Sequence, residues 1–359
     1  MDVVTLMKRI LFLTLAIAAF AGDLALARDK TDVVWMSNGD RITGEIKQLE
    51  HGKLRLSTDS LGDVSIEWDE IARIVSDYEF QFERTDGKRI TGTINPTPTQ
   101  QIISLKSDET SDDFAHENVV RISQIEDGFW ERLNGSLSFG YSFTKASDVA
   151  QGNLDFRATH RTEIRSWTLS GSTILTNDQA NESTQRSNLG LILTRFRSNR
   201  WFTSYILGLE SNDELRLDLR SSIGAGIGRF LVQTNTSELA LIGGLLGTAE
   251  NLSPVKNPVT GEIIFDPPSQ ENIEGMLGID YSRYVFDDPT VDLSTALSVY
   301  PSITDSGRTR AQFDVKLRWE MIKDLYWDLS YYNTYDSDPP SGSLSTNDYG
   351  VVTSIGWSF

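Results

Sequence analysis

From residue 134 to its end, the chain alternates between apolar and polar side chains. Leu137, Phe139 and Tyr141, for example, are separated by single serine or glycine residues. A period of two places successive side chains on opposite faces of a β-strand. Twelve segments follow this pattern, at 137–143, 154–158, 167–175, 189–193, 201–209, 215–227, 239–245, 273–281, 291–299, 311–319, 325–331 and 349–359. The pattern predicts twelve long strands, each with one face suited to hydrocarbon and the other to water.

The composition of the two faces distinguishes a membrane protein from a soluble one. A soluble β-sandwich would also alternate, but its core face does not need aromatic residues at both strand ends. Transmembrane barrels have aromatic girdles at both membrane interfaces and a polar interior, and this chain has both features. We therefore predict an all-β fold class, with a 12-stranded antiparallel transmembrane β-barrel over residues 129–359.

The connections between the predicted strands alternate in length. Odd-numbered connections such as 250–271 and 336–348 are mostly long and rich in Asp, Asn, Ser, Pro and Gly, whereas even-numbered ones such as 198–200 and 323–324 are tight. Outer-membrane barrels have long outer loops and short periplasmic turns. Because the number of strands is even, both ends of the barrel are expected on the periplasmic side.

The carboxyl end carries the most specific signal in the chain. Phe359 is the last residue, and Tyr349, Val351, Ile355 and Trp357 precede it at even spacing. This arrangement resembles the signal by which the barrel-assembly machinery of Gram-negative bacteria recognises outer-membrane proteins. The simpler alternative is an edge strand that ends in an aromatic residue. We expect the barrel-assembly machinery as a partner and the cell outer membrane as the location.

The first 27 residues have the features of an export signal. Lys8 and Arg9 precede an uncharged segment at 10–21 that is apolar except for one threonine, and a small-x-small pattern ends at Ala27. Those are the positively charged, apolar and cleavage regions of a signal peptide. The apolar segment is too short for a membrane anchor, since about 20 residues are needed to cross the hydrocarbon core. We predict export with cleavage between Ala27 and Arg28.

Residues 31–127 repeat themselves. The segment 38–46, with the sequence NGDRITGEI, returns as DGKRITGTI at 86–94, and 71–74 returns at 119–122. Both matches have an offset of 48 residues. Two matches at a single offset indicate a tandem repeat.

Each repeat unit consists of short apolar segments punctuated by turn residues. Asn-Gly and Asp-Gly pairs suit the positive φ angles of tight hairpin turns. Five short strands in about 48 residues resemble a small SH3-like or Sm-like barrel. We predict a periplasmic domain at 28–128, built from two such units at about 31–78 and 79–127.

Candidate chemical groups in this region have structural explanations. His51 lies in a predicted turn and His116 stands at the repeat position of Trp68, so neither histidine has a partner at the spacing of a metal site. Asp69 and Glu70 are expected to cap a short helical turn. We predict a binding or packing module without catalytic residues.

The motif at 38–46 and the barrel ending at 356–359 in GWSF together support a family resemblance. A signal peptide followed by this motif and this barrel resembles the domain-of-unknown-function 481 family, the YdiY-like salt-induced outer-membrane proteins. The resemblance covers nearly the whole mature chain. It implies an outer-membrane location, a barrel fold and a link to salt or ionic stress, and it assigns no activity.

The composition excludes several classes of function. The chain has 51 acidic and 33 basic residues, a net charge of −18. Such a surface repels the phosphates of nucleic acid. The absence of cysteine excludes disulfides, thiolate metal sites and cysteine nucleophiles. No cofactor and no resident metal are expected.

The negative charge is shared between the two predicted domains, with −9 in residues 28–128 and −9 in 129–359. The six predicted outer connections hold 13 acids against three bases, Lys145, Lys256 and Arg308. An acidic rim beside lipopolysaccharide phosphates is expected to be bridged by Mg²⁺ or Ca²⁺ through carboxylate oxygens.

The polar face of the predicted barrel carries charges of both signs. Strand parity places ten acids and eight bases inside the lumen. They are Asp155, Arg157, Arg161, Arg186, Glu210, Arg216, Asp218, Arg220, Glu238, Glu274, Asp280, Asp292, Arg310, Asp314, Lys316, Arg318, Glu320 and Asp328. This near-balance favours a lumen packed by ion pairs over a strongly ion-selective one.

Three functional interpretations remain open. The first is a passive narrow pore or a largely closed envelope-structural barrel, since twelve strands lie between a filled barrel and an aqueous channel. The second is an outer-membrane hydrolase, for which His160 is the barrel's only candidate general base. The third is an anchor whose periplasmic repeats bind peptidoglycan or a protein partner through aromatic residues. The candidates for that contact are Trp35, Trp68, Phe80 and Phe82. The sequence favours the first interpretation, a protein that is not an enzyme.

Overall fold

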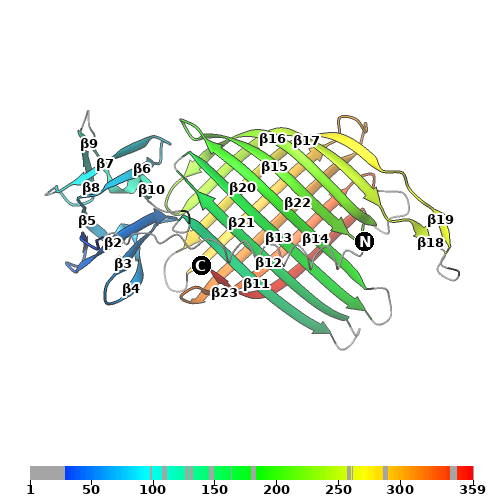
Figure 1. Ribbon diagram of the computed structural model, residues 1–359, viewed down its shortest axis with the longest axis horizontal. Helices are drawn as coiled ribbons and strands as arrows, with labels where there is room; N and C mark the ends of the chain where they lie inside the picture. Colours follow the sequence, from blue (N-terminus) through cyan, green and yellow to red (C-terminus); the bar gives the residue numbers. More distant parts are fainter. Residues whose placement is uncertain are drawn as a thin grey trace.

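The computed structural model consists of a small β-sheet domain and a closed β-barrel (Figure 1). It describes residues 29–97, 99–106, 111–125, 129, 132–144, 149–162, 164–178, 183–256, 260, 262–285, 290–339 and 346–358. The predicted signal segment with its cleavage site at Ala27 and Arg28, and the terminal Phe359, lie outside the described residues. Within the described ranges, no helix has the length and apolar character needed to cross a membrane.

The N-terminal domain is a ten-stranded sheet. Its strands are β1 (Asp32–Met36), β2 (Arg41–Glu50), β3 (Lys53–Thr58), β4 (Gly62–Glu67), β5 (Ile71–Val75), β6 (Glu79–Arg84), β7 (Arg89–Asn95), β8 (Ile102–Lys106), β9 (Ser111–Ala115) and β10 (Val119–Gln124). Hydrogen-bonded neighbours run in the order β4-β3-β2-β10-β6-β7-β8-β9, and β1 pairs with β2 and β5 off this path.

The 48-residue repeat of the sequence is also a repeat of structure. In each unit the first strand pairs with the second and the fifth, so that β1 pairs with β2 and β5 while β6 pairs with β7 and β10. One turn of 3-10 helix precedes the fifth strand of both units, at Trp68–Glu70 and His116–Asn118. The five strands that the sequence predicts for each unit are present.

The two units are fused into one sheet. Strand β2 has ten residues, whereas its repeat equivalent β7 has seven. The additional length allows Gln48 and Leu49 to pair with Ser123 and Ile122 of β10. Because this pairing makes the sheet continuous, the predicted tandem pair of SH3-like or Sm-like barrels is not confirmed.

A single apolar core serves both units. Phe80 and Phe82 are fully buried in it, as expected for core aromatics. Trp68 stacks on His116 with ring centroids 3.6 Å apart, and the indole Nε1 donates to the carbonyl oxygen of His116 at 2.9 Å. Since residues 68 and 116 are equivalent in the repeat, the two units contact each other at the same position of each.

The predicted capping role of Asp69 and Glu70 is wrong. The helical turn forms where the sequence predicts it, but no side chain makes a capping hydrogen bond at its N-cap, Glu67. Both acids are exposed. The turn is instead fixed by the buried ring of Trp68 and by the strands on either side.

Twelve antiparallel strands close the barrel, as the sequence predicts. They are β11 (Leu133–Thr144), β12 (Val149–Arg161), β13 (Arg165–Asp178), β14 (Thr184–Phe196), β15 (Trp201–Asn212), β16 (Leu217–Gln233), β17 (Ser237–Leu252), β20 (Gln270–Val285), β21 (Val291–Pro301), β22 (Thr309–Ile322), β23 (Leu325–Asp336) and β24 (Asn347–Ser358). A hairpin of β18 (Val255–Lys256) and β19 (Ile263–Phe265) projects from the connection between β17 and β20 (Figure 1).

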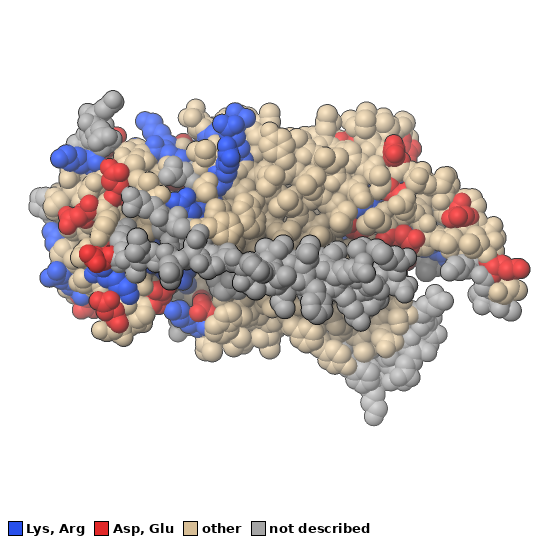
Figure 2. All heavy atoms as spheres, in the orientation of Figure 1, with Lys and Arg blue, Asp and Glu red and all other residues tan. Residues whose placement is uncertain are grey.

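The N-terminal domain lies against one end of the barrel, which we call the domain end, and the opposite end is the far end (Figure 1). Between them the outward-facing side chains are apolar and exposed, as in Phe139, Ile223 and Val351, which are 62%, 66% and 63% exposed. Figure 2 shows charged residues gathered over the domain and the two barrel ends, with an uncharged belt between them.

Aromatic side chains mark both ends of the barrel wall. Tryptophans of the barrel strands lie at the domain end, at Trp167, Trp201, Trp319, Trp327 and Trp357. Three exposed tyrosines lie at the far end, at Tyr141, Tyr335 and Tyr349, whereas the exposed Tyr205 and Tyr281 lie in the domain-end half. Two aromatic girdles that flank an apolar belt are the pattern of a transmembrane barrel.

Strand β16 differs from its prediction at one end. It begins at Leu217, two residues later than the alternation indicates, and a bulge interrupts its pairing between Leu217 and Leu219. Leu215 and Leu217 are buried instead of facing outward, and Arg216 lies in the preceding turn with a φ of 51°. The prediction that Arg216 lines the lumen wall is therefore wrong, because an extra residue at a bulge reverses strand parity.

The buried His116 makes the domain sensitive to pH. Burial lowers the pKa of His116 to about 4, below the value of about 6.5 in an unfolded chain. The unfolded state therefore binds more protons as the pH falls from about 6.5 to about 4, and the folded domain should lose about 3 kcal/mol over that range. Hydrogen exchange of the domain amides in the full chain would measure this loss. In His116→Gln the loss should be much smaller, and an equal loss in both proteins would contradict the assignment.

Candidate functional site in the barrel lumen

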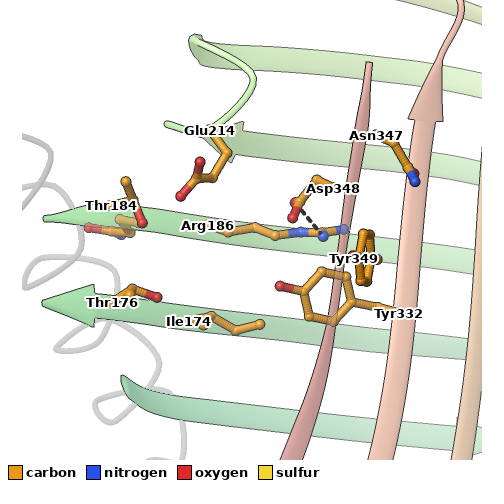
Figure 3. A pocket seen from close by; sticks show the side chains of 10 residues that line it. Ile174, Thr176, Thr184, Arg186, Glu214, Tyr332, Asn347, Asp348 and Tyr349 are labelled. Atoms are coloured by element: carbon orange, nitrogen blue, oxygen red, sulfur yellow. Dashed lines mark hydrogen bonds and ion pairs between the residues drawn. The ribbon is translucent and has the colours of Figure 1, made fainter. Parts of the chain in front are cut away.

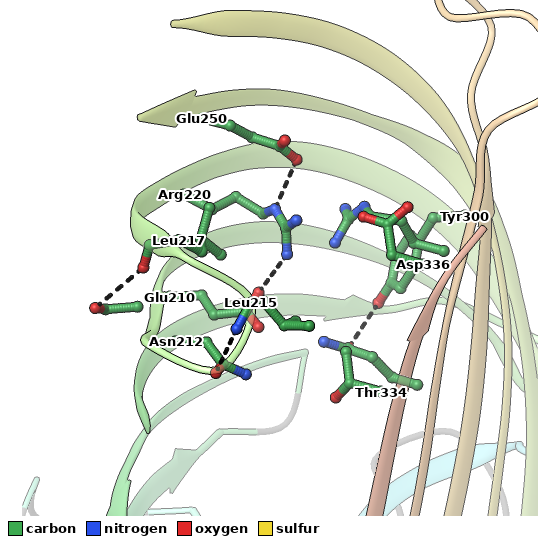
Figure 4. A network of polar contacts seen from close by, with 12 residues as sticks. Glu210, Asn212, Leu215, Leu217, Arg220, Glu250, Tyr300, Thr334 and Asp336 are labelled. Carbon is green, nitrogen blue, oxygen red and sulfur yellow. Dashed lines mark hydrogen bonds and ion pairs between the residues drawn. The ribbon is translucent and has the colours of Figure 1, made fainter. Parts of the chain in front are cut away.

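Paired charges fill the lumen near the far end (Figure 4). Arg308, from the connection between β21 and β22, donates from Nη2 to Glu250 Oε2 at 3.1 Å and to Asp336 Oδ2 at 2.7 Å. Arg220 of β16 donates from Nε to Glu250 and from Nη1 to Glu210, both at 2.8 Å. Glu250 is completely buried and Arg308 is 3% exposed. A chain of alternating charges thus joins five strands and connections; we call these five residues the far-end network.

A second buried pair lies beside this network. Arg310 of β22 donates from Nε to Glu274 Oε1 at 2.9 Å and from Nη2 to Oε2 at 2.5 Å. Two parallel bonds between a guanidinium and a carboxylate fix both groups in one plane and are stronger than neutral hydrogen bonds. The ring centroid of Tyr300 lies 5.1 Å from the Arg310 guanidinium carbon.

A third group of polar side chains crosses the lumen from β14 and β15 to β23 and β24. Arg186 donates to Asp348 Oδ2 at 2.9 Å and to Thr334 Oγ1 at 2.8 Å, and Asn212 donates to the same Asp348 oxygen at 3.0 Å. These groups border a cavity of ≈ 300 Å³ (Figure 3). Its lining residues are Ile174, Thr176, Thr184, Gln185, Arg186, Glu214, Tyr332, Asn347, Asp348 and Tyr349.

These contacts join strands that are distant around the barrel. Strands β17 and β23 are separated by β20, β21 and β22, and β15 and β24 are separated by β14, β13, β12 and β11. The bridge from Glu250 through Arg308 to Asp336, and the bond from Asn212 to Asp348, must therefore pass through the lumen. Paired charges occupy its cross-section near the far end.

The lumen nearer the domain is also charged. Arg318 donates to the two carboxylate oxygens of Asp328 at 2.9 and 3.0 Å, and its guanidinium lies 3.5 Å from the ring centroid of Tyr326. Lys316 Nζ is 3.6 Å from the same carboxylate. Six further residues were predicted to line the lumen, and all lie within barrel strands: Asp155, Arg157, Glu238, Asp280, Asp292 and Asp314.

The structure joins some of the predicted lumen residues and moves others to the ends. Ion pairs include Arg186, Glu210, Arg220, Glu274, Arg310, Lys316, Arg318 and Asp328. Arg161 and Glu320 instead contact the N-terminal domain. Asp218 is exposed beside the bulge of β16 and accepts a hydrogen bond from Ser253.

Sequence reasoning missed four members of these networks. Glu250, Asp336 and Asp348 were assigned by pattern to outer connections, yet each lies at the end of a strand and faces the lumen. Extending the strand parity a few residues would have identified them, because their positions have the parity of inward residues. Arg308 comes from a connection, for which parity gives no signal. The outer rim is thus less acidic than predicted.

The domain covers the barrel mouth through a buried acid, Glu83 of β6. Its carboxylate accepts hydrogen bonds from Arg89 and from Arg161 of the barrel, both at 3.2 Å, and from Gln233 at 3.5 Å. Arg121 Nε lies 3.5 Å away. Burial alone would raise the pKa of Glu83, but the arginines outweigh it and lower that pKa. One ionised carboxylate thus connects the domain to the barrel strands β12 and β16.

Glu50 repeats this arrangement on β2, which β10 separates from β6 in the sheet. Its carboxylate accepts a hydrogen bond from Arg121. Burial would raise the pKa of Glu50, but the charges of Arg121, His51 and Arg161 lower it to about 2. The acid therefore stays ionised at any physiological pH.

Contacts around the rim of the mouth complete the docking. His51 stacks on Tyr284 with ring centroids 4.2 Å apart. Lys53 Nζ lies 3.8 Å from Glu320, and Asn235 donates to the carbonyl oxygen of Val119 at 2.8 Å. These contacts are spread over several turns of the barrel's domain end, so the domain lies across the mouth.

The histidine considered as a general base lies elsewhere. His160 contacts the rings of Phe129 and Trp167, with centroids 4.6 and 5.6 Å away, and those two rings lie 6.0 Å from each other. These rings belong to the aromatic girdle at the domain end. Across the described ranges, no group of three His, Asp or Glu side chains is arranged to hold a metal ion.

Neutralising Glu83 should loosen the domain from the barrel. Glu83→Gln leaves Arg121 and Arg161 buried without one of their counter-charges, and breaking a buried ion pair costs about 3–5 kcal/mol. Hydrogen exchange in β6, in β10 and in the barrel turns at 197–200 and 234–236 should speed up accordingly. Glu79→Gln, an exposed acid of the same strand, is the matched control and should leave exchange unchanged. Equal exchange in the two variants would refute the role of Glu83.

Several solved structures are similar to part of this chain. Similar solved structures include the NanC porin, with 11% identity, a TM-score of 0.37, and coverage of 63% of this chain and 98% of that one. The KdgM porin in complex with disordered oligogalacturonate has 11% identity, a TM-score of 0.34, and coverage of 63% and 99%. A Pseudomonas aeruginosa FadL homologue has 11% identity, a TM-score of 0.27, and coverage of 78% and 86%.

No curated protein matches the chain. The model of a family described as "Protein of unknown function, DUF481" matches residues 137–359, which confirms the resemblance seen in the sequence. The chain belongs to the DUF481 family.

Proposed function

We propose that this protein is an envelope-structural barrel of the outer membrane whose lumen is held closed. The far-end network fills one end of the lumen, and the N-terminal domain covers the other. Of the two alternatives, a passive pore and a structural barrel, we therefore favour the structural barrel.

The barrel wall supports the placement in the outer membrane. An apolar exposed belt lies between aromatic residues at the two ends of the barrel, as a lipid bilayer requires. The tight connections lie at the domain end and the projecting β18–β19 hairpin at the far end. We therefore place the domain in the periplasm and the far end outside the cell.

The main observation in support of a closed lumen is the burial of Glu250. Its carboxylate is fully buried between Arg220 and Arg308. Burial of a charged carboxylate has a large desolvation penalty, which is offset only where its partners are fixed. Removing one partner is therefore strongly unfavourable. Salt screens buried pairs much less than exposed ones. A closure made in this way would persist when external salt changes, which agrees with the link to ionic stress implied by the family resemblance.

Conductance in planar bilayers tests the closed state. The full-length protein should insert without steady current. Arg186→Ala combined with Arg308→Ala removes the arginine bridges across the lumen and should produce a steady current at least about tenfold above the leak of the unmodified protein. Arg195→Ala, on an exposed position of β14, is the control and should stay silent. Steady current from the unmodified protein would refute the closed state, and silence of the double variant would assign closure to the domain alone.

A second candidate function is that of an envelope anchor. Strand β9 is the last strand of the sheet and lies at the end of the domain away from the barrel (Figure 1). A sheet edge offers backbone N–H and C=O groups to an added strand. Trp68, Phe80 and Phe82 are buried and unavailable to a partner, whereas Trp35 is half-buried.

Crosslinking in cells tests the anchor. A photo-crosslinker placed at Asp113 of β9 should capture a periplasmic protein or peptidoglycan fragment reproducibly. The same group at Asp59, an exposed residue of a tight turn in the first unit, is the control. If both positions give the same products, the anchor function fails.

We propose no hydrolase activity for the barrel. A general base must lie within hydrogen-bond reach of the group that it activates. His160 is held instead in an aromatic stack on the outward face of the wall.

A further inference from the structure

A row of three charged residues crosses the sheet of the second repeat unit. Glu83 on β6 is the cross-strand neighbour of Arg89 on β7 and of Arg121 on β10. This row meets the barrel, because the Glu83 carboxylate also accepts a hydrogen bond from Arg161 at 3.2 Å. The second unit thus docks through a carboxylate that lies between two arginines of the sheet.

The first unit has the same row with a different central residue. The repeat offset of 48 residues places Trp35 at the position of Glu83, and Arg41 and Arg73 at the positions of the two arginines. Trp35 on β1 is the cross-strand neighbour of Arg41 on β2 and of Arg73 on β5. Both arginines are therefore repeated, whereas an indole replaces the carboxylate. We call Arg41, Trp35 and Arg73 the first-unit row.

The arginines of the first-unit row lack the counter-charge that their equivalents have. Their guanidinium carbons lie over the indole, 5.4 Å from the ring centroid for Arg41 and 4.0 Å for Arg73. Among the described residues, neither guanidinium forms an ion pair, although Asp40 and Glu70 are exposed in the adjoining turns. A guanidinium has five N–H donors, so both arginines can bind an anionic acceptor from outside the chain.

The first-unit row is remote from the barrel. Arg41 begins β2, and Glu50 at the end of the same strand lies at the domain–barrel contact. Ten residues of strand span about 30 Å. Strand β5, which carries Arg73, lies at the end of the domain away from the barrel (Figure 1). In the proposed orientation this end points into the periplasm, so the acceptor comes from there and not from lipid head groups.

The surface of the domain favours a polar polymer over a folded protein as the partner. The core of a protein–protein interface is apolar and depleted in charge. In the described part of the domain, Leu61 is the only large apolar side chain that is exposed. A polymer that repeats a small anionic group needs no apolar patch, because many weak contacts together give firm attachment.

We propose that the first-unit row binds carboxylates on the peptide stems of peptidoglycan. Arg41 and Arg73 donate hydrogen bonds to the carboxylate oxygens, and the indole between them holds both guanidiniums in place. Residues 28–128 carry a net charge of −9, so the rest of the domain repels the polymer and the row supplies the specific contact. The inference rests on the proposed periplasmic placement and deepens the anchor function, and it does not require the closed lumen.

Co-sedimentation of the full-length protein in detergent with purified peptidoglycan sacculi tests the row. Arg41→Gln combined with Arg73→Gln should lower the bound fraction at least about threefold. Lys88→Gln combined with Lys106→Gln removes the same charge from exposed positions of the second unit and is the matched control. Equal binding by the two double variants, or no binding by the unmodified protein, would overturn the proposal.

A substitution at the centre of the row tests the comparison between the units. Trp35→Glu gives the first unit the row of the second, so an internal carboxylate occupies both arginines and binding should fall as far as in the double arginine variant. Trp35→Gln removes the indole without adding a charge and should bind better than Trp35→Glu. Hydrogen exchange in β1 and β5 verifies that each variant is folded. Unchanged binding by Trp35→Glu would exclude the two arginines as the binding groups.

Chemical modification of the sacculi tests the ligand group. Sacculi whose carboxylates have been converted to methylamides should bind much less protein, and high salt should weaken binding to unmodified sacculi because exposed charges are screened. Equal binding to both kinds of sacculi would refute recognition of carboxylates.

Labelling in cells separates this inference from the proposed placement. The chain has no cysteine, so Leu61→Cys introduces a single thiol at an exposed position of the first unit. A membrane-impermeant maleimide should label that variant only after the outer membrane has been permeabilised. Labelling in intact cells contradicts the periplasmic placement. Protection in intact cells together with no binding to sacculi contradicts this inference alone.

Discussion

The structure depends on the pairing of arginine with carboxylates in places that water barely reaches. Glu250 has two guanidinium partners and no exposed surface. Such an acid is stable only while both partners stay in place, because an unpaired charge in a low-dielectric interior costs several kcal/mol. Replacing the group with apolar residues could stabilise the barrel as well. What the charged chain adds is a fixed geometry across the lumen, from β15 to β23.

The same chemistry recurs where the two parts of the protein meet. Glu83 and Glu50 of the domain lie among Arg89, Arg121 and Arg161. The arginines lower the pKa of both acids in spite of burial. Moderate acid therefore leaves this interface ionised, whereas it charges the buried His116 at the contact between the repeat units. The domain's own fold should yield to acid before its attachment to the barrel does.

The sequence predicted the wall of the barrel far better than its contents. Alternation is a local property, so twelve strands and the inward parity of Arg220 could be read from neighbours along the chain. The pairing of Gln48 and Leu49 with β10 is a contact between distant segments, and it turned two expected small barrels into one sheet. Arg308 reaches the lumen from a connection, where no period exists. The β16 bulge moved Arg216 because one inserted residue exchanges the two faces.

The bonds across the lumen and the shortest strand pairing of the barrel both involve β24. Side chains from opposite strands meet inside the barrel and prevent it from contracting. The size of the ion-pair network therefore sets the circumference of the wall. Arg186 and Asn212 draw Asp348, and with it the start of β24, toward the lumen. Strand β11 stays paired along its whole length with β12 and does not follow. As a result, only four residue pairs join β11 and β24. The ion pairs across the lumen and the short pairing with β11 are thus two properties of the same strand, β24.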